Sequence, residues 1–222
     1  MNTVLNAALR DSLSDPARIK MHYKHFTDID SFRPLSPAGL QALPPSIRKR
    51  SDHSRPPRLR TTVRHEKGRS PYIAARIVKV NVANLQIYSP NDPYDLRISI
   101  NVEVNLDRPD LAPEDLVVGD EDSPKEPPQP DRRKDRISYN HLAYQIDLTR
   151  VDVGGAAGTK GPKPIYELEI EVDAQLLRAQ MRIAEEGGRE CAYGDVVAGF
   201  WDDAVLLMRE RPPQQPAVQS QR

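Results

Sequence analysis

The sequence predicts an α+β protein in which an antiparallel β-barrel is flanked by helices. Between residues 58 and 172, polar and apolar side chains alternate in several runs, which is typical of strands with one polar and one apolar face. Apolar residues recur at helical spacing near both ends of the chain, over 2–13 and 194–209. The charged residues segregate by strand, and they would line the lumen of a sheet that closes with its polar face inward.

Composition sets the broad class of the protein. The 222 residues suffice for one large domain or two small ones, and 32 basic residues balance 32 acidic ones, so net charge favours no partner. The single cysteine, Cys191, excludes an internal disulfide and fits a reducing compartment. No apolar run reaches membrane-spanning length and the N-terminus shows no secretory signal. We therefore expect a soluble intracellular protein with no membrane partner.

The first quarter of the chain is expected to hold helices and then a loop. Residues 1–32 are predicted to be N-terminal helices, one over 2–13 and a second after the cap and proline of 14–16. The apolar residues of that second helix would be Ile19, Tyr23 and Phe26. Residues 33–57 are rich in Pro, Ser and Arg, which predicts a disordered loop.

Residues 58–210 are expected to form a β domain that ends in two helices. The alternating runs predict strands over 59–64, 76–88, 97–105, 132–139, 144–151 and 166–172. An acidic, proline-rich insertion is expected over 106–131, and a disordered tail over 211–222. Asp173 is expected to cap a helix that runs to about Glu186, and the last helix is expected over about 194–209.

The run from Tyr166 to Val172 is the most informative segment. Strand geometry places Glu167, Glu169 and Glu171 on one face. Carboxylates in a row repel one another, and such a row is kept when a cation or a set of basic groups lies opposite. An edge strand that exposes its polar face to water is the alternative interpretation.

Other strands carry charges that could face this row. Arg132, Lys134 and Arg136 share one strand face, and Arg97 shares another with Glu103. Carboxylates hold hard divalent cations, whereas Arg and Lys hold phosphate oxygens. Such a lumen would fit a metal–polyphosphate complex and the attack of water on its terminal phosphoryl group. The chain lacks a glycine-rich phosphate loop with a following lysine, which excludes that class of nucleotide-binding enzyme.

Several motifs, taken in order, resemble those of the fungal-type mRNA-capping RNA 5′-triphosphatases, a family of triphosphate tunnel metalloenzymes. The matching segments are 87–90, 95–103, 134–139, 145–149 and 167–171, and the resemblance covers roughly residues 20 to 210. It implies hydrolysis of the γ-phosphate of 5′-triphosphate mRNA, the first step of cap formation, in the nucleus and with Mg²⁺ or Mn²⁺. The implied partners are the 5′ end of nascent mRNA, an mRNA guanylyltransferase and a second copy of the chain.

The resemblance also implies roles for particular side chains. Lys134 and Arg136 would contact the γ-phosphate, and Glu103 would orient or activate the attacking water. Asp147 would support the water and the metal shell, and the expected catalytic residues are Glu103, Lys134, Arg136, Asp147 and Glu169. Metal binding is expected at Glu167, Glu169 and Glu171. Phosphate binding is expected at Arg60, Lys79, Arg97, Arg132, Lys134 and Arg136.

One family feature has no counterpart in the sequence. The family's first strand carries a Glu-x-Glu pair that supplies two metal ligands, and we find no such strand before residue 58. We therefore expect an incomplete barrel, from a truncated sequence or a tunnel without those ligands. The alternative functions are an inactive module that binds RNA 5′ ends or polyphosphate, and a structural β domain with solvent-exposed polar faces.

Overall fold

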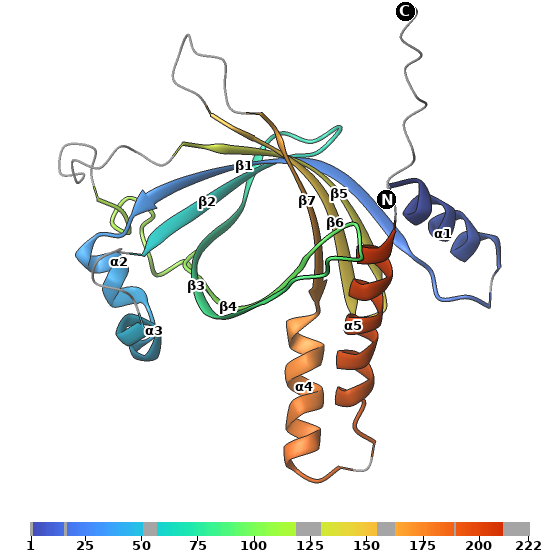
Figure 1. Ribbon diagram of the computed structural model, residues 1–222. Helices are drawn as coiled ribbons and strands as arrows, with labels where there is room; N and C mark the ends of the chain where they lie inside the picture. The colour runs from blue at the N-terminus through green and yellow to red at the C-terminus, as the bar shows by residue number, and fades with distance from the viewer. Residues whose placement is uncertain are drawn as a thin grey trace, which may run out of the picture.

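An arched antiparallel sheet forms the centre of the molecule (Figure 1). The computed structural model describes residues 2–15, 17–50, 57–118, 130–154, 163–188 and 190–210. The seven strands are ordered β4-β3-β2-β1-β5-β6-β7, and in the described part of the chain the end strands β4 and β7 do not pair. Their bounds are β1 His22–Pro34, β2 Arg58–His65, β3 Tyr72–Ile87, β4 Leu96–Asn105, β5 Arg132–His141, β6 Tyr144–Val153 and β7 Ile165–Val172. The predicted fold class, an incomplete antiparallel barrel with flanking helices, is confirmed.

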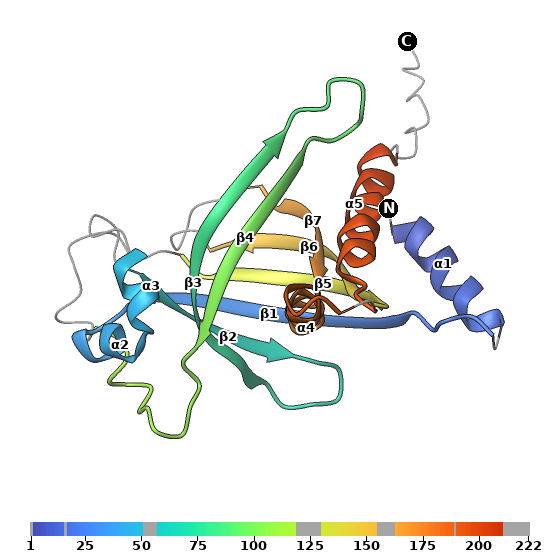
Figure 2. The same ribbon diagram turned by 90° about the horizontal axis from the view of Figure 1, so that it is seen from below.

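Five helices surround this sheet in the described part of the chain. They are α1 Asn2–Ser14, α2 Pro37–Ala42, α3 Pro45–Arg50, α4 Ala174–Glu185 and α5 Tyr193–Arg209. The view from below places α2 and α3 at one end of the sheet and α1 and α5 at the other (Figure 2). None of the helices in the described ranges has the length and apolar character needed to cross a membrane.

The apolar core lies on the outer face of the sheet in two clusters. Strand alternation directs one set of side chains outward, where the helices cover them. One cluster joins β2 and β3 to α2 and α3 through Leu35, Leu43, Ile47, Leu59, Val78, Leu106 and Leu116. The other joins β5 and β6 to α1 and α5 through Leu5, Tyr139, Ile146 and Leu207. The polar faces of the same strands are therefore left to line the concave side of the arch.

The predicted second helix is wrong, because His22–Pro34 forms β1. This strand pairs with β2 on one side and β5 on the other, so it lies in the middle of the sheet. Phe26, Asp28 and Asp30 alternate with less buried residues along it. The two aspartates look like surface residues in the sequence, and the spacing of Ile19, Tyr23 and Phe26 imitated a helix. Pairing on both sides overrides that local pattern.

The predicted loop over 33–57 is also wrong for its first part, which contains α2 and α3. Ser36 caps α2 by accepting a hydrogen bond from Gly39 N at 3.0 Å. Within the predicted insertion 106–131, Leu106 and Leu116 are each 1% exposed and belong to the core. Residues 51–56, 119–129 and the predicted tail 211–222 lie outside the described residues.

The close contact at Gly39 gives a stability test. A Cβ at this position would lie 2.3 Å from the backbone oxygen of Leu116. We predict that Gly39→Ala lowers the free energy of unfolding by about 1–3 kcal/mol, the range for forced overpacking. Gly194→Ala in α5 is the matched control, because no atom lies within 4 Å of the added Cβ. Denaturant melts should show no loss of stability for the control; equal behaviour of the two variants would contradict this packing.

Candidate functional site

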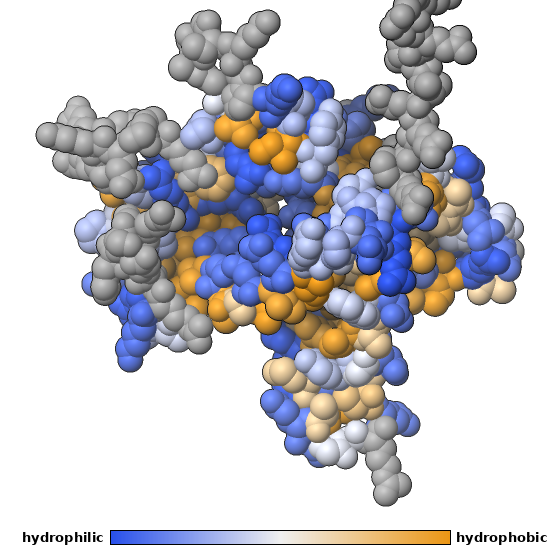
Figure 3. Space-filling model, in the orientation of Figure 1, coloured by the Kyte–Doolittle hydropathy of each residue, from blue (hydrophilic) through white to orange (hydrophobic). Residues whose placement is uncertain are grey.

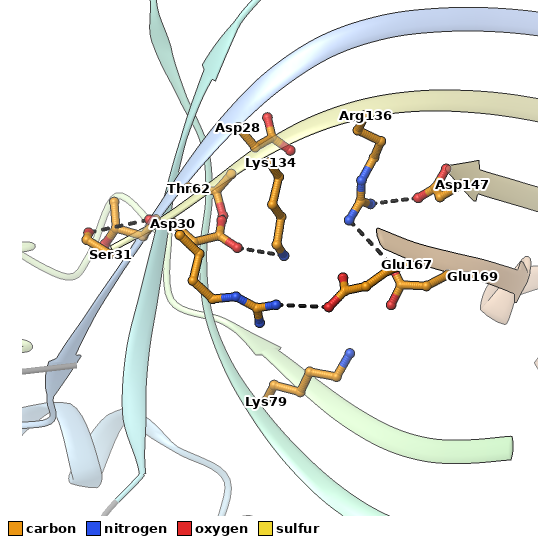
Figure 4. A network of polar contacts seen from close by, with 12 residues as sticks. Asp28, Asp30, Ser31, Thr62, Lys79, Lys134, Arg136, Asp147, Glu167 and Glu169 are labelled. Atoms are coloured by element: carbon orange, nitrogen blue, oxygen red, sulfur yellow. Dashed lines mark hydrogen bonds and ion pairs between the residues drawn. The ribbon is translucent and has the colours of Figure 1, made fainter. Parts of the chain in front are cut away.

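Charged and hydroxyl side chains gather on the concave face of the sheet. In-register pairing places Asp30 opposite Thr62 on β2 and opposite Arg132 on β5. The buried polar residues of this face are Asp28, Asp30, Thr62, Lys134, Ser138, Asp147 and Thr149. Figure 4 shows side chains from several strands pointing toward one another, and Figure 3 shows hydrophilic residues where the surface is hollowed beneath the arch.

Lys134 is held by a buried aspartate that the sequence did not reveal. Its Nζ lies 2.8 Å from Oδ2 of Asp30, which is only 1% exposed. Thr62 Oγ1 donates to the other carboxylate oxygen at 2.6 Å. Burial alone would raise the pKa of Asp30. The hydrogen bonds from Lys134 and Thr62, with the charges of Lys134 and Arg60, outweigh burial and hold that pKa below its ordinary value.

Arg136 is held in a comparable way by Asp147. Nη1 of the arginine lies 2.6 Å from Asp147 Oδ2, and Nη2 lies 3.5 Å from Glu169 Oε2. Asp147 is fully buried, and it also accepts hydrogen bonds from Ser138 Oγ and from Gln145 Nε2. Three side chains, Arg136, Ser138 and Gln145, thus donate to one carboxylate, and Asp147 and Glu169 together fix the direction of the guanidinium.

The three glutamates of β7 have different surroundings. Glu167 Oε1 accepts from Arg132 Nη2 at 3.0 Å, and Glu169 accepts from Arg136. Glu171 forms no ion pair within the described residues. The Glu171 residue is exposed at the edge of the lumen, but the protein atoms around its carboxyl desolvate it and raise its pKa, and the carboxylates of Glu169 and Asp147 raise that pKa further. The charges of Arg136 and Lys79 act in the opposite direction.

The remaining predicted residues divide into two groups. Lys79 Nζ lies 3.3 Å from Glu103 Oε1, and its charge reaches Glu171 across the lumen, so this pair belongs to the site. Arg60 lies close enough to Asp30 to affect its pKa. Arg97 is six residues from Glu103 along β4, which corresponds to about 20 Å in a strand. The structure therefore does not bring Arg97 into the charged cluster.

Sequence reasoning missed the acidic residues of β1. Besides Asp30, Asp28 accepts two hydrogen bonds from Arg64 Nε and Nη2, at 2.8 and 2.9 Å. The same guanidinium lies 3.8 Å from the ring centroid of Phe26. The alternation of Asp28 and Asp30 with the apolar Ile29 is the sequence pattern that could have predicted a strand with both aspartates on one face. Both aspartates are engaged by basic side chains.

Three buried donors on this face have no partner. Among the described residues, Arg60 Nε, Arg136 Nε and Thr149 Oγ1 are buried and form no hydrogen bond. Buried polar groups are normally satisfied, so an unpaired set needs an explanation. Donors of this kind bind phosphate oxygens well, and two of them belong to guanidinium groups. The lumen therefore offers unpaired donors that could bind the oxygens of an anion such as phosphate.

The carboxylates fit a cation only if another molecule supplies most of its ligands. In the described part of the chain, no three acidic, histidine or cysteine side chains are grouped so that they could hold a metal ion. Glu167 and Glu169 point to arginines, which leaves Glu171 as the carboxylate that would gain most from a nearby cation. Mg²⁺ commonly uses one or two carboxylates together with substrate phosphates and water. The residues present fit a cation of that shared kind.

This arched sheet with paired acidic and basic strands matches a known family. Residues 1–212 match the family described as "mRNA capping enzyme, beta chain". The chain belongs to that family. The mRNA-capping enzyme subunit beta of Schizosaccharomyces pombe is 30% identical over 218 residues, which is 95% of this chain and 58% of the relative. The subunit of Cryptococcus neoformans is 27% identical over 139 residues, 62% of this chain and 30% of the relative.

Two solved structures share the fold. The S. pombe Pct1 RNA triphosphatase in complex with the Spt5 CTD superposes with a TM-score of 0.65 and 28% identity. Pct1 without that partner gives 0.63 and 27%. Both comparisons cover 95% of this chain, and 67% and 66% of the Pct1 chains. The chain thus spans 58% of the length of its S. pombe relative and two thirds of the solved chains.

The buried Lys134–Asp30 pair can be tested by stability. We predict that Asp30→Asn lowers the free energy of unfolding by about 3–5 kcal/mol, because Lys134 would remain buried without its counter-charge. The contribution of Asp30 is present above the ordinary aspartate pKa and is lost as the pH falls through its lowered folded-state pKa. The variant and the parent should therefore converge in stability in strong acid.

Asp135→Asn is the matched control on β5. This aspartate pairs with His25 in a contact where both side chains are about half exposed. Removing such an exposed pair should cost only about 0–1 kcal/mol. Urea melts at several pH values measure both variants, and a loss at Asp30 no larger than at Asp135 would contradict the enclosed position of Asp30.

Proposed function

We propose that this chain forms the phosphate-binding wall of an RNA 5′-triphosphatase. With Mg²⁺ or Mn²⁺, the enzyme would remove the γ-phosphate from 5′-triphosphate mRNA, the first step of cap formation in the nucleus. One observation carries the proposal: the concave face holds Lys134 and Arg136 rigidly against buried aspartates while Arg136 Nε, Arg60 Nε and Thr149 Oγ1 remain free to donate. Membership of the capping-enzyme beta-chain family supports the choice of an RNA 5′ end as substrate.

In this mechanism, the basic side chains position the terminal phosphate. Lys134 Nζ and the guanidinium of Arg136 would hold its oxygens, and their buried partners would prevent either cation from moving away. Glu103 would accept a proton from the attacking water, and Lys79, at 3.3 Å, would hold that carboxylate in place. The water oxygen bonds to the γ-phosphorus, the bond to the β-phosphate oxygen breaks, and the RNA leaves with a diphosphate end.

A divalent cation would neutralise negative charge on the phosphate oxygens. Among the residues of this chain, Glu171 with Glu169 beside it would hold such an ion. Proton uptake at Glu171 would compete with the cation, and its pKa is raised by the surrounding wall. To the binding of this cation, the chain would therefore contribute mainly the Glu171 carboxylate, which lies among fixed arginine and lysine side chains.

The alternative function is a module that binds RNA 5′ ends or polyphosphate without turnover. It is favoured by the pairing of Glu167 and Glu169 with arginines, and by the lack of a three-ligand metal group in the described ranges. The same lumen donors would bind the polyphosphate. Binding that survives removal of divalent cations, without phosphate release, would distinguish this function from catalysis.

The proposal extends to partners. An mRNA guanylyltransferase would use the diphosphate product. A second copy of the chain fits the exposed apolar residues of the α4–α5 hairpin, which are Leu176, Met181, Tyr193, Val197, Trp201 and Leu206. Figure 1 shows this hairpin projecting away from the sheet. The Spt5 CTD seen with Pct1 suggests a peptide partner of the same kind for this chain.

A phosphate-release assay tests the proposed activity. The purified chain is mixed with RNA that carries a labelled γ-phosphate, with Mn²⁺ or Mg²⁺, and free phosphate is measured. We predict release that a chelator abolishes, and that Arg136→Ala reduces by about 100-fold or more, as expected when one transition-state donor is removed.

Arg150→Ala on β6 is the control, because Arg150 is exposed and pairs with Asp152 instead of facing the lumen. This variant should release phosphate within about twofold of the parent. If the chain binds tripolyphosphate but releases no phosphate from the RNA, the result would favour the binding module over the enzyme. Failure to bind tripolyphosphate at all would contradict both functions.

A further inference from the structure

The β3–β4 hairpin extends well past the charged cluster. β3 has 16 residues, and its pairing with β4 continues from Lys79–Glu103 to Ile87–Leu96. Figure 2 shows this hairpin rising away from the other strands of the sheet. Its inward face is therefore a continuation of the lumen wall that leads away from the proposed phosphate site.

This continuation is polar but uncharged near the lumen. Asn81 pairs with Asn101 and Asn84 with Ser99, and a β-bulge between Asn81 and Ala83 places both β3 asparagines on the same face. Asn81 Nδ2 donates to Asn101 Oδ1 at 3.0 Å, and Asn84 Nδ2 donates to Asn81 Oδ1 at 2.8 Å. Ser99 Oγ donates to Asn84 Oδ1 at 2.7 Å. The amides are thus fixed in place, although Asn81 and Asn84 are exposed to solvent and Asn101 is half-buried.

One amide of this network has donors left over. Within the described contacts, the side-chain NH₂ group of Asn101 donates to no other residue, while its Oδ1 accepts from Asn81. A fixed, half-buried amide donor next to a phosphate site can bind a sugar hydroxyl or a phosphodiester oxygen. Neutral donors of this kind suit a chain whose charge density is lower than that of a triphosphate.

The far end of the hairpin carries a cation and an exposed aromatic ring. Arg97 pairs with Gln86, and Tyr88 follows two residues later with 78% of its surface exposed. In the turn beyond, Ser89 N donates to Asp95 Oδ1 at 3.0 Å, and Asp92 Oδ1 lies 3.6 Å from Nε of the exposed Arg209 on α5. A large exposed ring beside a hydrogen-bonded turn is available for stacking.

We propose that the inward face of the β3–β4 hairpin binds the single-stranded RNA that follows the 5′-triphosphate. The amides of Asn81, Asn84 and Asn101 contact its sugar–phosphate backbone, Arg97 pairs with a downstream phosphate, and Tyr88 stacks on a base. Single-stranded nucleic acids are bound in this way, by a backbone-tracking groove with aromatic rings for stacking. The inference rests on the proposed function, because the charged lumen must hold the 5′ end. It accounts for Arg97, which lies too far along β4 to reach the γ-phosphate site.

A binding experiment with two ligands separates this track from the phosphate site. The ligands are a ten-nucleotide 5′-triphosphate RNA and inorganic tripolyphosphate, and the full chain is used as parent, Tyr88→Ala and Tyr166→Ala. Tyr166 is a matched control, since it is 76% exposed but alternates with the inward glutamates of β7. We expect Tyr88→Ala to weaken RNA binding by about fivefold or more, the effect of losing one stacked base. Tripolyphosphate binding should stay within about twofold for both variants.

Salt dependence tests Arg97 independently of stacking. Arg97→Gln should reduce the slope of log K against log salt for the RNA by about 0.7, the value for one phosphate contact on a single strand. Arg150→Gln should leave that slope unchanged. These readouts do not depend on turnover.

The outcomes are distinguishable. RNA binding by Tyr88→Ala equal to that of the parent overturns the track, as does an equal loss for RNA and tripolyphosphate. A parent chain that fails to bind tripolyphosphate, or that binds 5′-hydroxyl RNA as tightly as triphosphate RNA, overturns the proposed function instead. In that case a selective loss in Tyr88→Ala would still support RNA binding by the hairpin.

Discussion

The pairing of acidic and basic side chains across the concave face is the constraint on which this structure depends. Asp30 and Asp147 are buried beneath Lys134 and Arg136, and burying charges is costly unless each has a partner and hydrogen bonds. Thr62 donates such a hydrogen bond to Asp30, and Ser138 and Gln145 donate to Asp147. The polar faces of the strands are therefore fixed inward, and helices cover the apolar faces on the outside at the two core clusters.

Much of this arrangement could be predicted from alternation alone. Alternation predicted one polar face for the β7 glutamates and another for the β5 bases, and in the structure Arg132–Glu167 and Arg136–Glu169 ion pairs join the two strands across β6 on the same concave face. β1 was missed, because Asp28 and Asp30 look like surface residues until their partners are known, and those partners lie 36 and 104 residues away. Long-range pairs of this kind leave no periodic signal within one segment.

The charge on the concave face changes along the sheet. Around Lys134 the face is dense in both signs, whereas along the β3–β4 hairpin it becomes a neutral network of amides that ends near Arg97 and Tyr88. A triphosphate end followed by a ribonucleotide chain has the same gradient, with high charge at one end and one charge per nucleotide beyond it. Because the charge of the concave face changes in the same direction as the charge of the RNA, the proposed hairpin site would favour triphosphate RNA over free polyphosphate at the proposed hydrolytic site.

The central claim is that the carboxylates of the concave face are held among fixed basic groups and crowded against one another, and carboxyl titration measures this directly. Carbon-13 NMR of labelled Asp and Glu side chains reports the pKa of each group in the intact chain. The structure predicts that Glu171 titrates above the ordinary glutamate range, because of desolvation and the carboxylates of Glu169 and Asp147, and that Asp30 titrates below the ordinary aspartate range. Ordinary values for both residues would contradict this arrangement of charges and the site built on it.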